Sequence, residues 1–447
     1  MMQNRAHWTN RLAFVLAASG SAIGLGNLWK FPYIAGTNGG GAFVLVYLAC
    51  IAIIGFPVLI GELFVGQQSQ KNVVQSFEVL HRHRTPWRIA GWMGLVSAFL
   101  ILSFYSVVGG WILDFEVRAL LNQFATRSGE EIKSYLDTLF ASPFRVLFWH
   151  FAFMVLTTGI VANGVKKGIE RWTKILMPIL SLILLGLLIY SFFLSGFNQA
   201  LGFLFSWDTS QLTVDGVLEA MGHAFFTLSL GMGAMLTYGS YLDKNESLPR
   251  TALTVAVMDT VIALVSGLVI FSIVFSHGVD PQAGPELMFK TLPVLFAQIP
   301  GGTFIAIAFF LLVAFAALTS AVSLLEVVVA YWEETHNKNR TYTAIICGMA
   351  IAILGVFSAL SFNVLSNVKV GGLTIFDLLD TITSQALLPL GGTLIALFFG
   401  WVLGKRAIEM VMKTGSEKTF SAVILWCNRA IAPLAILGAI GYKLITS

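Results

Sequence analysis

The chain contains 447 residues, of which 57% are hydrophobic and only 11% are charged. This composition excludes a water-soluble domain, which needs a polar surface, and it places the chain in a lipid bilayer. The formal net charge of +4 is modest and gives no reason to expect a nucleic-acid partner. The cysteines Cys50, Cys347 and Cys427 fall in apolar segments and have the spacing of neither a metal site nor a disulfide framework.

Apolar segments of membrane-spanning length follow one another along the whole chain. We predict an all-α integral membrane protein of a single domain, residues 1–447, in the cell membrane, which in a bacterium is the inner membrane. Lysines and arginines concentrate on the side of the N-terminus, which predicts a cytoplasmic N-terminus; an odd number of spans then places the C-terminus outside. The eleven predicted spans are 11–37, 41–69, 88–122, 144–161, 170–194, 215–241, 250–278, 303–334, 341–361, 373–401 and 419–444.

The first span contains a run that an ordinary membrane helix would not contain. From Gly20 to Asn27 the chain reads GSAIGLGN, and Gly39-Gly40-Gly41 follows closely. Non-helical backbone at bilayer depth leaves N–H and C=O groups without partners, so it persists only where it lines a cavity or coordinates a ligand. The run predicts a binding site, although a single glycine would more often mark close helix packing.

A second interruption lies in the sixth span, between Phe225 and Gly233, where glycines and hydroxyls again stand in apolar sequence. The two interrupted spans are five helices apart. Such a pair predicts a transporter made of two inverted five-helix repeats, about 8–194 and 215–401, with an additional helix at 419–444 and alternating access to a central site.

Other classes of membrane protein fit the sequence less well. A sodium channel needs a filter built symmetrically by several subunits, whereas these interruptions are asymmetric. An intramembrane enzyme needs a nucleophile and base or a metal cluster, and the seven histidines are scattered, so we expect no enzyme. An amino-acid sensor built on the same fold, without transport, stays open as an alternative.

Several motifs together resemble the neurotransmitter:sodium symporter family, in particular its bacterial amino-acid transporters with the leucine-transporter fold. This family is a standard example of the inverted-repeat architecture, so that expectation comes partly from the resemblance. The resemblance covers essentially the whole chain, and the motifs that carry it are specific. They are Arg5, Trp8, Gly20 to Asn27, Lys30-Phe31-Pro32, Asn38 to Phe43, Gly168-Ile169-Glu170-Arg171 and Phe225 to Gly233.

The resemblance implies two sodium ions and no organic cofactor. The first ion would bind the Ala22 carbonyl, Asn27, Thr227, Asp259 and the carboxylate of the substrate. The second would bind the carbonyls of Gly20, Ile23 and Ala316 and the hydroxyls of Thr319 and Ser320. Without the family context, a Thr-Ser pair in a membrane helix usually bonds back to its own helix.

Asp259 departs from the family pattern, which commonly has asparagine there. Some bacterial members carry a glutamate one turn later, where this chain has Ala263. Asp259 would then supply the negative charge that chloride supplies in the animal members, so transport would be chloride-independent. His223 stands where glutamine is more usual, and it is either a proton-sensitive element or an interhelical hydrogen-bond partner.

The resemblance also implies a zwitterionic amino acid as the small-molecule substrate, bound within the bilayer. Monoamine carriers of the family have an aspartate where this chain has Gly24, and the predicted pocket is largely apolar, so we expect neutral, mainly hydrophobic or aromatic L-amino acids. The predicted substrate-binding residues are Ser21, Ala22, Gly24, Leu25, Gly26, Ile101, Tyr105, Phe226, Thr227, Ser229, Met232, Ser320 and Leu324. The oligomeric state is left open.

Charges at bilayer depth, together with the resemblance, imply gates on both sides of the site and the roles of the residues below. The outer gate would consist of Lys30, Asp380, Tyr105 and Phe226, and the inner gate of Arg5, Trp8, Ser240, Tyr241 and Glu334. Glu62 and Glu326 would stabilise the interrupted sixth helix, or serve equally well as protonated structural hydrogen bonders. Gly168 and Pro178 would let the cytoplasmic end of the fifth helix unwind, unless they are an ordinary loop glycine and an ordinary membrane proline.

Overall fold

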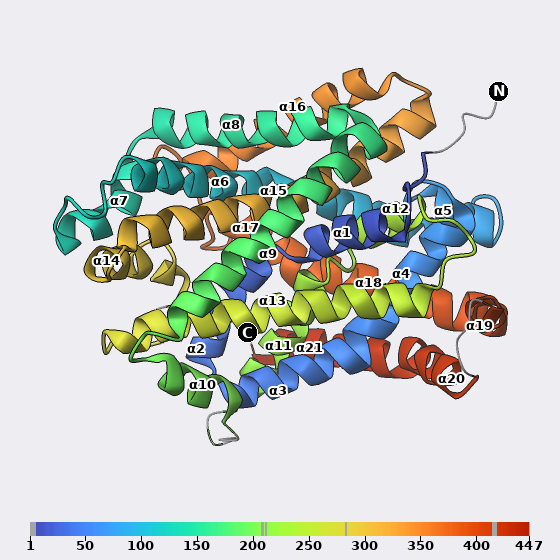
Figure 1. The fold of residues 1–447 in the computed structure, drawn as a ribbon. Coiled ribbons are helices and arrows are strands. Elements are labelled where there is room, and N and C mark those ends of the chain that lie inside the picture. The colour runs from blue at the N-terminus through green and yellow to red at the C-terminus, as the bar shows by residue number, and fades with distance from the viewer. Residues whose placement is uncertain (1–5, 207–209, 211, 282–283, 414–417, 447) are drawn as a thin grey trace.

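The structure is a computed structural model and describes residues 6–206, 210, 212–281, 284–413 and 418–446. The described chain is helical apart from its turns, its loops and one isolated bridge between Val370 and Leu373. Figure 1 shows long helices running across the molecule, with α7 (Gly129–Ala141) and α14 (Thr291–Gln298) at one end. The opposite end holds α5 (Gln75–Leu80) and α19 (Gly404–Lys413) (Figure 1).

Helices that can cross a membrane make up most of the fold. In the described residues, nine helical segments are long and apolar enough, and α1 (Arg11–Ala22) with the bent helix Gly26–Thr37 forms a tenth. The remaining predicted span, 215–241, is divided between α11 (Val214–Thr227) and α12 (Ala234–Gly239), each too short to cross alone. The prediction of an all-α membrane protein with interrupted first and sixth helices is therefore confirmed.

The bounds of the other helices complete the chain order. The long ones are α6 (Arg88–Leu120), α8 (Pro143–Ala162), α9 (Arg171–Ser191), α13 (Leu248–Ser276), α15 (Gly302–His336) and α16 (Arg340–Leu360). The shorter ones are α2 (Phe31–Thr37), α3 (Gly41–Cys50), α4 (Phe56–Ser69), α10 (Phe197–Phe205), α17 (Ile375–Ile382), α18 (Leu388–Leu397), α20 (Lys418–Trp426) and α21 (Ala432–Thr446). Single π-helical turns lie at Gly26–Lys30, Ile51–Gly55, Val165–Glu170, Thr383–Leu387, Phe398–Leu403 and Cys427–Ile431, and a 3-10 turn at Gly284–Leu287.

The first interruption is short and is closed by a side chain. The helix α1 ends at Ala22 because Ile23 is extended, with φ −72° and ψ 99°. The backbone N–H of Gly24 donates to Oδ1 of Asn27 at 3.0 Å, so the asparagine side chain replaces a helical acceptor. The chain then turns into the helix Gly26–Thr37 at 47° to α1.

The second interruption is longer and uses left-handed backbone. Between α11 and α12, positive φ angles occur at Ser229 (54°), Gly231 (76°) and Gly233 (75°). A Cβ atom on Gly231 would collide with the carbonyl oxygen of Leu388, so glycine is required there for space as well as conformation. The Gly231 N–H donates to Oε1 of buried Glu62 at 2.7 Å, which confirms that Glu62 stabilises this interruption.

Candidate functional site

The two interruptions meet at the backbone carbonyl of Ser21. The hydroxyl of Ser229 donates to this carbonyl at 2.8 Å, and the hydroxyl of Ser320 on α15 donates to it at 3.0 Å. The Ser21 hydroxyl in turn bonds to that of Ser323 at 2.7 Å. One carbonyl freed by the end of α1 is thus satisfied from both the sixth span and α15, as buried polar backbone requires.

A pocket of about 320 Å³ lies at this junction. Every predicted substrate residue except Thr227 lines it, and Ser323 is an additional lining residue that the sequence analysis missed. Ser323 lies one helical turn after Ser320, so the i, i+3 spacing on α15 was the signal that could have found it. The lining residues are Ser21, Ala22, Gly24, Leu25, Gly26, Ile101, Tyr105, Phe226, Ser229, Met232, Ser320, Ser323 and Leu324.

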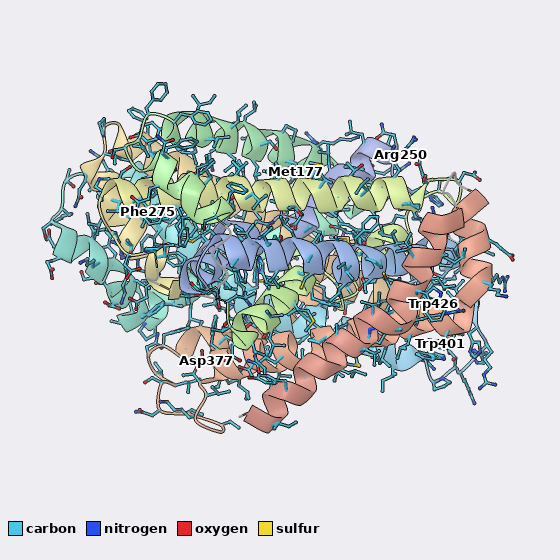
Figure 2. The ribbon with its side chains drawn as sticks, turned by 90° about the horizontal axis from the view of Figure 1, so that it is seen from below. Met177, Arg250, Phe275, Asp377, Trp401 and Trp426 are labelled. Atoms are coloured by element: carbon cyan, nitrogen blue, oxygen red, sulfur yellow. The ribbon has the colours of Figure 1, made fainter. Side chains whose placement is uncertain are left out.

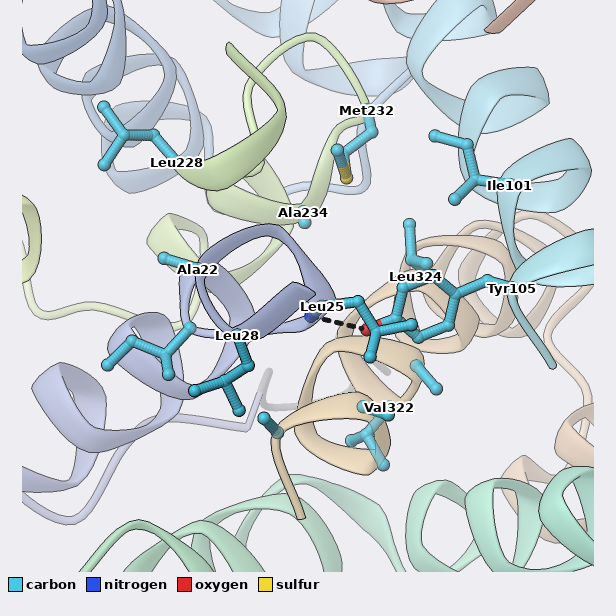
Figure 3. Close-up of a cluster of buried hydrophobic side chains, with 14 of the residues drawn as sticks. Ala22, Leu25, Leu28, Ile101, Tyr105, Leu228, Met232, Ala234, Val322 and Leu324 are labelled. Atoms are coloured by element: carbon cyan, nitrogen blue, oxygen red, sulfur yellow. Dashed lines mark hydrogen bonds between the residues drawn. The ribbon is translucent and has the colours of Figure 1, made fainter. Parts of the chain in front are cut away.

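The pocket has a polar end and an apolar end. At the polar end the Leu25 N–H points at the Tyr105 hydroxyl, at 3.5 Å (Figure 3). A Cβ on Gly24 would lie 2.5 Å from Oγ of Ser320, so only glycine leaves this end open. Figure 3 shows Ile101, Leu324 and Met232 gathered around the other end. The lining therefore suits a molecule with one polar end and an apolar body.

Behind the pocket, Asp259 of α13 joins the two interrupted spans. Its Oδ1 accepts hydrogen bonds from Nδ2 of Asn27 at 2.7 Å and from Oγ1 of Thr227 at 2.9 Å. All three side chains are buried. Thr227 faces this cluster, which explains why it does not line the pocket. The amide nitrogen of Asn27 faces Asp259 here, while its oxygen accepts from the Gly24 N–H. The carboxylate of Asp259 and the hydroxyl oxygen of Thr227 are of the kind that suits a hard cation such as Na⁺.

The residues predicted for a second sodium ion lie on α1, at its C-terminal end (Ile23) and on α15. Thr319 bonds back to its own helix, with Oγ1 3.1 Å from the Ala316 carbonyl oxygen. A Cβ on Gly20 would lie 3.3 Å from Cβ of Thr319, so α1 approaches α15 closely at this point. Ile23 and Ala316 are fully buried. Gly20 and Thr319 thus meet where the two helices approach each other.

A second, outer pocket of about 490 Å³ adjoins the first. Leu25, Tyr105 and Phe226 line both pockets, and Lys30 and Asp380 line the outer one. Nζ of Lys30 lies 4.9 Å from the centre of the Phe226 ring. Lys30 and Asp380 do not form a direct ion pair within 4.0 Å in the described structure. The side chains of Tyr105 and Phe226, which line both pockets, therefore separate them.

The residues predicted for the inner gate include Trp8, which is hydrogen-bonded to the end of the sixth span. Its indole N–H donates to the Tyr238 carbonyl at 3.0 Å, and its backbone N–H donates to the Tyr241 carbonyl at 3.2 Å. Glu334 accepts from the backbone and side-chain nitrogens of Asn72, at 2.9 and 3.1 Å. Ser240 is buried beside Tyr241, with its hydroxyl 2.5 Å from the Thr237 carbonyl. The predicted gate residue Arg5 lies outside the described residues.

The N-terminal segment is also fastened to the start of α9. The Thr9 N–H donates to Oε2 of Glu170 at 3.0 Å, and Oε1 of Glu170 pairs with Lys174 at 2.6 Å. Glu170 is the last residue of the π-helical turn Val165–Glu170, which contains Gly168. The segment that holds α1 is thus tied to the predicted unwinding point of α9.

Glu326 and His223 occupy surroundings that the sequence did not define. Glu326 accepts from the Tyr241 hydroxyl at 2.6 Å and pairs with Arg340 of α16, so it ties the end of the sixth span to α15 and α16.

His223 is buried against Tyr47, with ring centres 5.3 Å apart. Neither ring nitrogen of His223 has a hydrogen-bond partner among the described residues, which argues against a simple interhelical hydrogen bond.

Comparison with known proteins decides the family. The family model described as the sodium:neurotransmitter symporter family matches residues 5–133 and 143–447. The chain belongs to this family. Membership makes the protein a sodium-dependent membrane transporter and not an enzyme, as the sequence predicted.

Individual relatives of the transporter agree with this assignment. It is 40% identical to an uncharacterized sodium-dependent transporter, YhdH, of Bacillus subtilis, over 97% of each chain. It is 33% identical to an uncharacterized sodium-dependent transporter of Haemophilus influenzae, again over 97% of each chain. Among solved structures, the crystal structure of MhsT in complex with L-phenylalanine superposes with a TM-score of 0.90 at 46% identity, covering 98% of this chain and 99% of the other.

Proposed function

We propose that this transporter imports neutral, mainly hydrophobic or aromatic L-amino acids by symport with sodium, through alternating access. The observation that carries the proposal is the pocket at which both interrupted helices meet, with a polar end at Leu25 and Tyr105 and an apolar end at Ile101 and Leu324. The phenylalanine bound to MhsT, a structure 46% identical in sequence, supports the same substrate class.

The polar end suits the charged groups of an amino acid. An N–H at the start of the helix Gly26–Thr37 and the Tyr105 hydroxyl would meet the carboxylate, since helix N-termini favour anions. The ammonium would meet carbonyls at the end of α11 and the Ser229 hydroxyl. Gly24 leaves no acidic side chain to hold an amine that lacks a carboxylate.

We assign the first sodium ion to Ala22, Asn27, Thr227 and Asp259, together with the substrate carboxylate. The buried Asp259 carboxylate supplies negative charge, so chloride is not required. The second ion is assigned to Gly20, Ile23, Ala316, Thr319 and Ser320. Two ions moving down a potential of 100 mV and a tenfold gradient provide on the order of 7 kcal/mol, enough for about a 10⁵-fold accumulation.

Alternating access would proceed between the two gates. Tyr105 and Phe226, with Lys30 and Asp380 above them, close the outer side, and Trp8 with Tyr241 closes the inner side. The two repeats, about 8–194 and 215–401, would move against each other around the pocket, with the N-terminus in the cytoplasm and the C-terminus outside.

Uptake by proteoliposomes tests this function. Radiolabelled leucine, phenylalanine, tryptophan, alanine and glutamate would be offered with an inward sodium gradient or with potassium, each with and without chloride. We expect sodium-driven accumulation of the hydrophobic and aromatic amino acids, unchanged by chloride removal. Sodium-dependent binding without accumulation would support a sensor instead, and accumulation of glutamate alone would contradict the substrate class.

A further inference from the structure

A buried turn near the C-terminus places an arginine inside an apolar span. The π-helical turns Phe398–Leu403 and Cys427–Ile431 pack against each other, and Arg429 of the second turn reaches across to the first. Its Nε donates to the Gly400 carbonyl at 2.7 Å. A Cβ on Gly400 would lie 2.9 Å from Cγ of Arg429, so the close approach fixes the direction of the arginine side chain. A charge in such a segment is costly unless it is paired or reaches the interface.

Two exposed tryptophans frame the guanidinium group. Its central carbon lies 5.2 Å from the ring centre of Trp401 and 5.8 Å from that of Trp426. The Trp401 indole N–H donates to the Arg429 carbonyl at 3.1 Å, which holds that ring in place. Yet Trp401 and Trp426 are 61% and 58% exposed, and Figure 2 shows them close together on the C-terminal helices. Exposed tryptophans in a membrane protein favour the interface between headgroups and acyl chains.

The same place carries further positive charge without a partner. The helix α19 begins at Gly404, where a Cβ would lie 3.2 Å from Nη2 of Arg429. The next two residues, Lys405 and Arg406, are exposed. Within the described residues none of these three cations forms an ion pair, although the exposed Glu409 lies one turn along α19. Because Gly404 approaches the Arg429 guanidinium, the two cations that follow it bring further positive charge to the same part of the molecule.

The surroundings favour a lipid as the anion that this positive charge would bind. The helices α20 and α21 precede and follow the turn that carries Arg429, and they expose apolar side chains, including Val423 at 55% and Leu434 at 70%. A phosphate with acyl chains attached covers these side chains, whereas a free phosphate leaves them exposed. Arginine suits phosphate because its planar fork donates two parallel hydrogen bonds.

We propose that Arg429, Lys405 and Arg406, framed by Trp401 and Trp426, form a binding site for the headgroup of an anionic phospholipid. The phosphate contacts the free edge of the Arg429 guanidinium, and the two exposed cations of α19 add attraction. The acyl chains lie along α20 and α21. The site is separate from the amino-acid pocket, so it does not depend on which amino acid is carried.

Native mass spectrometry of the full chain with added lipid tests the site. The probes are phosphatidylglycerol and, as the neutral reference, phosphatidylcholine. We expect the wild type to retain phosphatidylglycerol in preference. The double variant K405Q/R406Q should lose at least about tenfold in affinity for phosphatidylglycerol, because each cation near an anionic headgroup contributes roughly fivefold. Arg429→Lys, which keeps the charge but loses the fork, should also weaken binding.

The matched control is K166Q/K167Q, which removes two exposed lysines from the turn before α9. We expect this control to bind phosphatidylglycerol like the wild type. Equal loss in both double variants would assign the effect to general charge and overturn the site, as would equal binding of the two lipids by the wild type. Displacement of the lipid by millimolar inorganic phosphate would overturn the lipid assignment. Since Lys405 and Arg406 are exposed, the test stands even if Arg429→Lys fails to fold.

Discussion

The two helix interruptions that form the pocket are built differently. The first spans Ile23 to Leu25 and is closed by local hydrogen bonds at Gly24, whose N–H donates to the Asn27 side chain and whose carbonyl accepts from the Asn27 N–H. The second spans Leu228 to Gly233, contains three left-handed residues, and depends on Glu62 from another helix. A short, locally closed turn holds its N–H and C=O groups in fixed directions, whereas a longer loop with glycines can change its path.

The difference assigns separate tasks to the two interruptions. The first presents groups that a carboxylate and a cation need at fixed positions, because electrostatic contacts weaken quickly when their geometry changes. The second presents Met232, an unbranched and polarizable side chain that fills spaces of varied shape. The first interruption would then recognise the amino and carboxylate groups that all substrates share. The second would accommodate side chains of different shape.

The largest effect is expected at Asp259, which joins the two interruptions. Asp259→Asn removes the charge that Asn27 and Thr227 contact, and hydrogen bonds to charged groups contribute roughly 1.5–3 kcal/mol each. Sodium-driven uptake in chloride-free buffer should fall on the order of 100-fold, with partial recovery when chloride is added. The control is Asp377→Asn, which changes an exposed carboxylate on α17. Unchanged chloride-free uptake by Asp259→Asn would contradict the assigned role.

Gly231→Ala should destabilise the second interruption. Alanine at a φ of 76° costs about 1–2 kcal/mol, and its Cβ must also displace the Leu388 carbonyl. We expect the free energy of unfolding to fall by at least about 2 kcal/mol, measured by thermal unfolding in detergent. Gly222→Ala is the matched control, because a Cβ there meets nothing within 4 Å inside α11. Equal stability of both variants would show that the loop adopts another path.

Met232→Phe should change selectivity more than total activity. A ring at this position narrows the apolar end of the pocket, and a change of one or two methylene groups alters discrimination by roughly 1–3 kcal/mol. The ratio of tryptophan to leucine uptake should fall about tenfold. Met232→Leu, which nearly conserves volume, is the control and should keep the ratio. If leucine uptake fell while the ratio of tryptophan to leucine uptake stayed the same, Met232 would not determine selectivity, and recognition at the first interruption would be affected instead.

The smallest effect is expected at the outer charges, which contact neither interruption's backbone. Lys30 and Asp380 are partly exposed and form no direct ion pair in the described structure. Exposed pairs contribute about 0–1 kcal/mol, so Asp380→Asn should change the KM for uptake by less than about fivefold. A change as large as that of Asp259→Asn would mean that these charges meet during transport.

Sequence reasoning reached the fold because bilayer thickness and backbone hydrogen bonding leave few choices for an apolar chain. It located the two interruptions because glycines at bilayer depth are conspicuous, and the resemblance to the family supplied the pocket residues on other helices, such as Ile101, Tyr105 and Leu324. It missed Ser323, whose hydroxyl resembles many others that bond to their own helix, and the tie from Glu326 to Arg340. Both contacts depend on which faces of the helices pack against each other, and this is decided by long-range packing.

The hydrogen bond between Thr9 and Glu170 tolerates mutation at its donor residue but not at its acceptor residue. Its donor is a backbone N–H, so every residue except proline at position 9 can supply it. Its acceptor is a side chain, held in place by Lys174. Substitution of Thr9 by any residue except proline therefore leaves this hydrogen bond intact. Its strength would change through substitution of Glu170 or of Lys174.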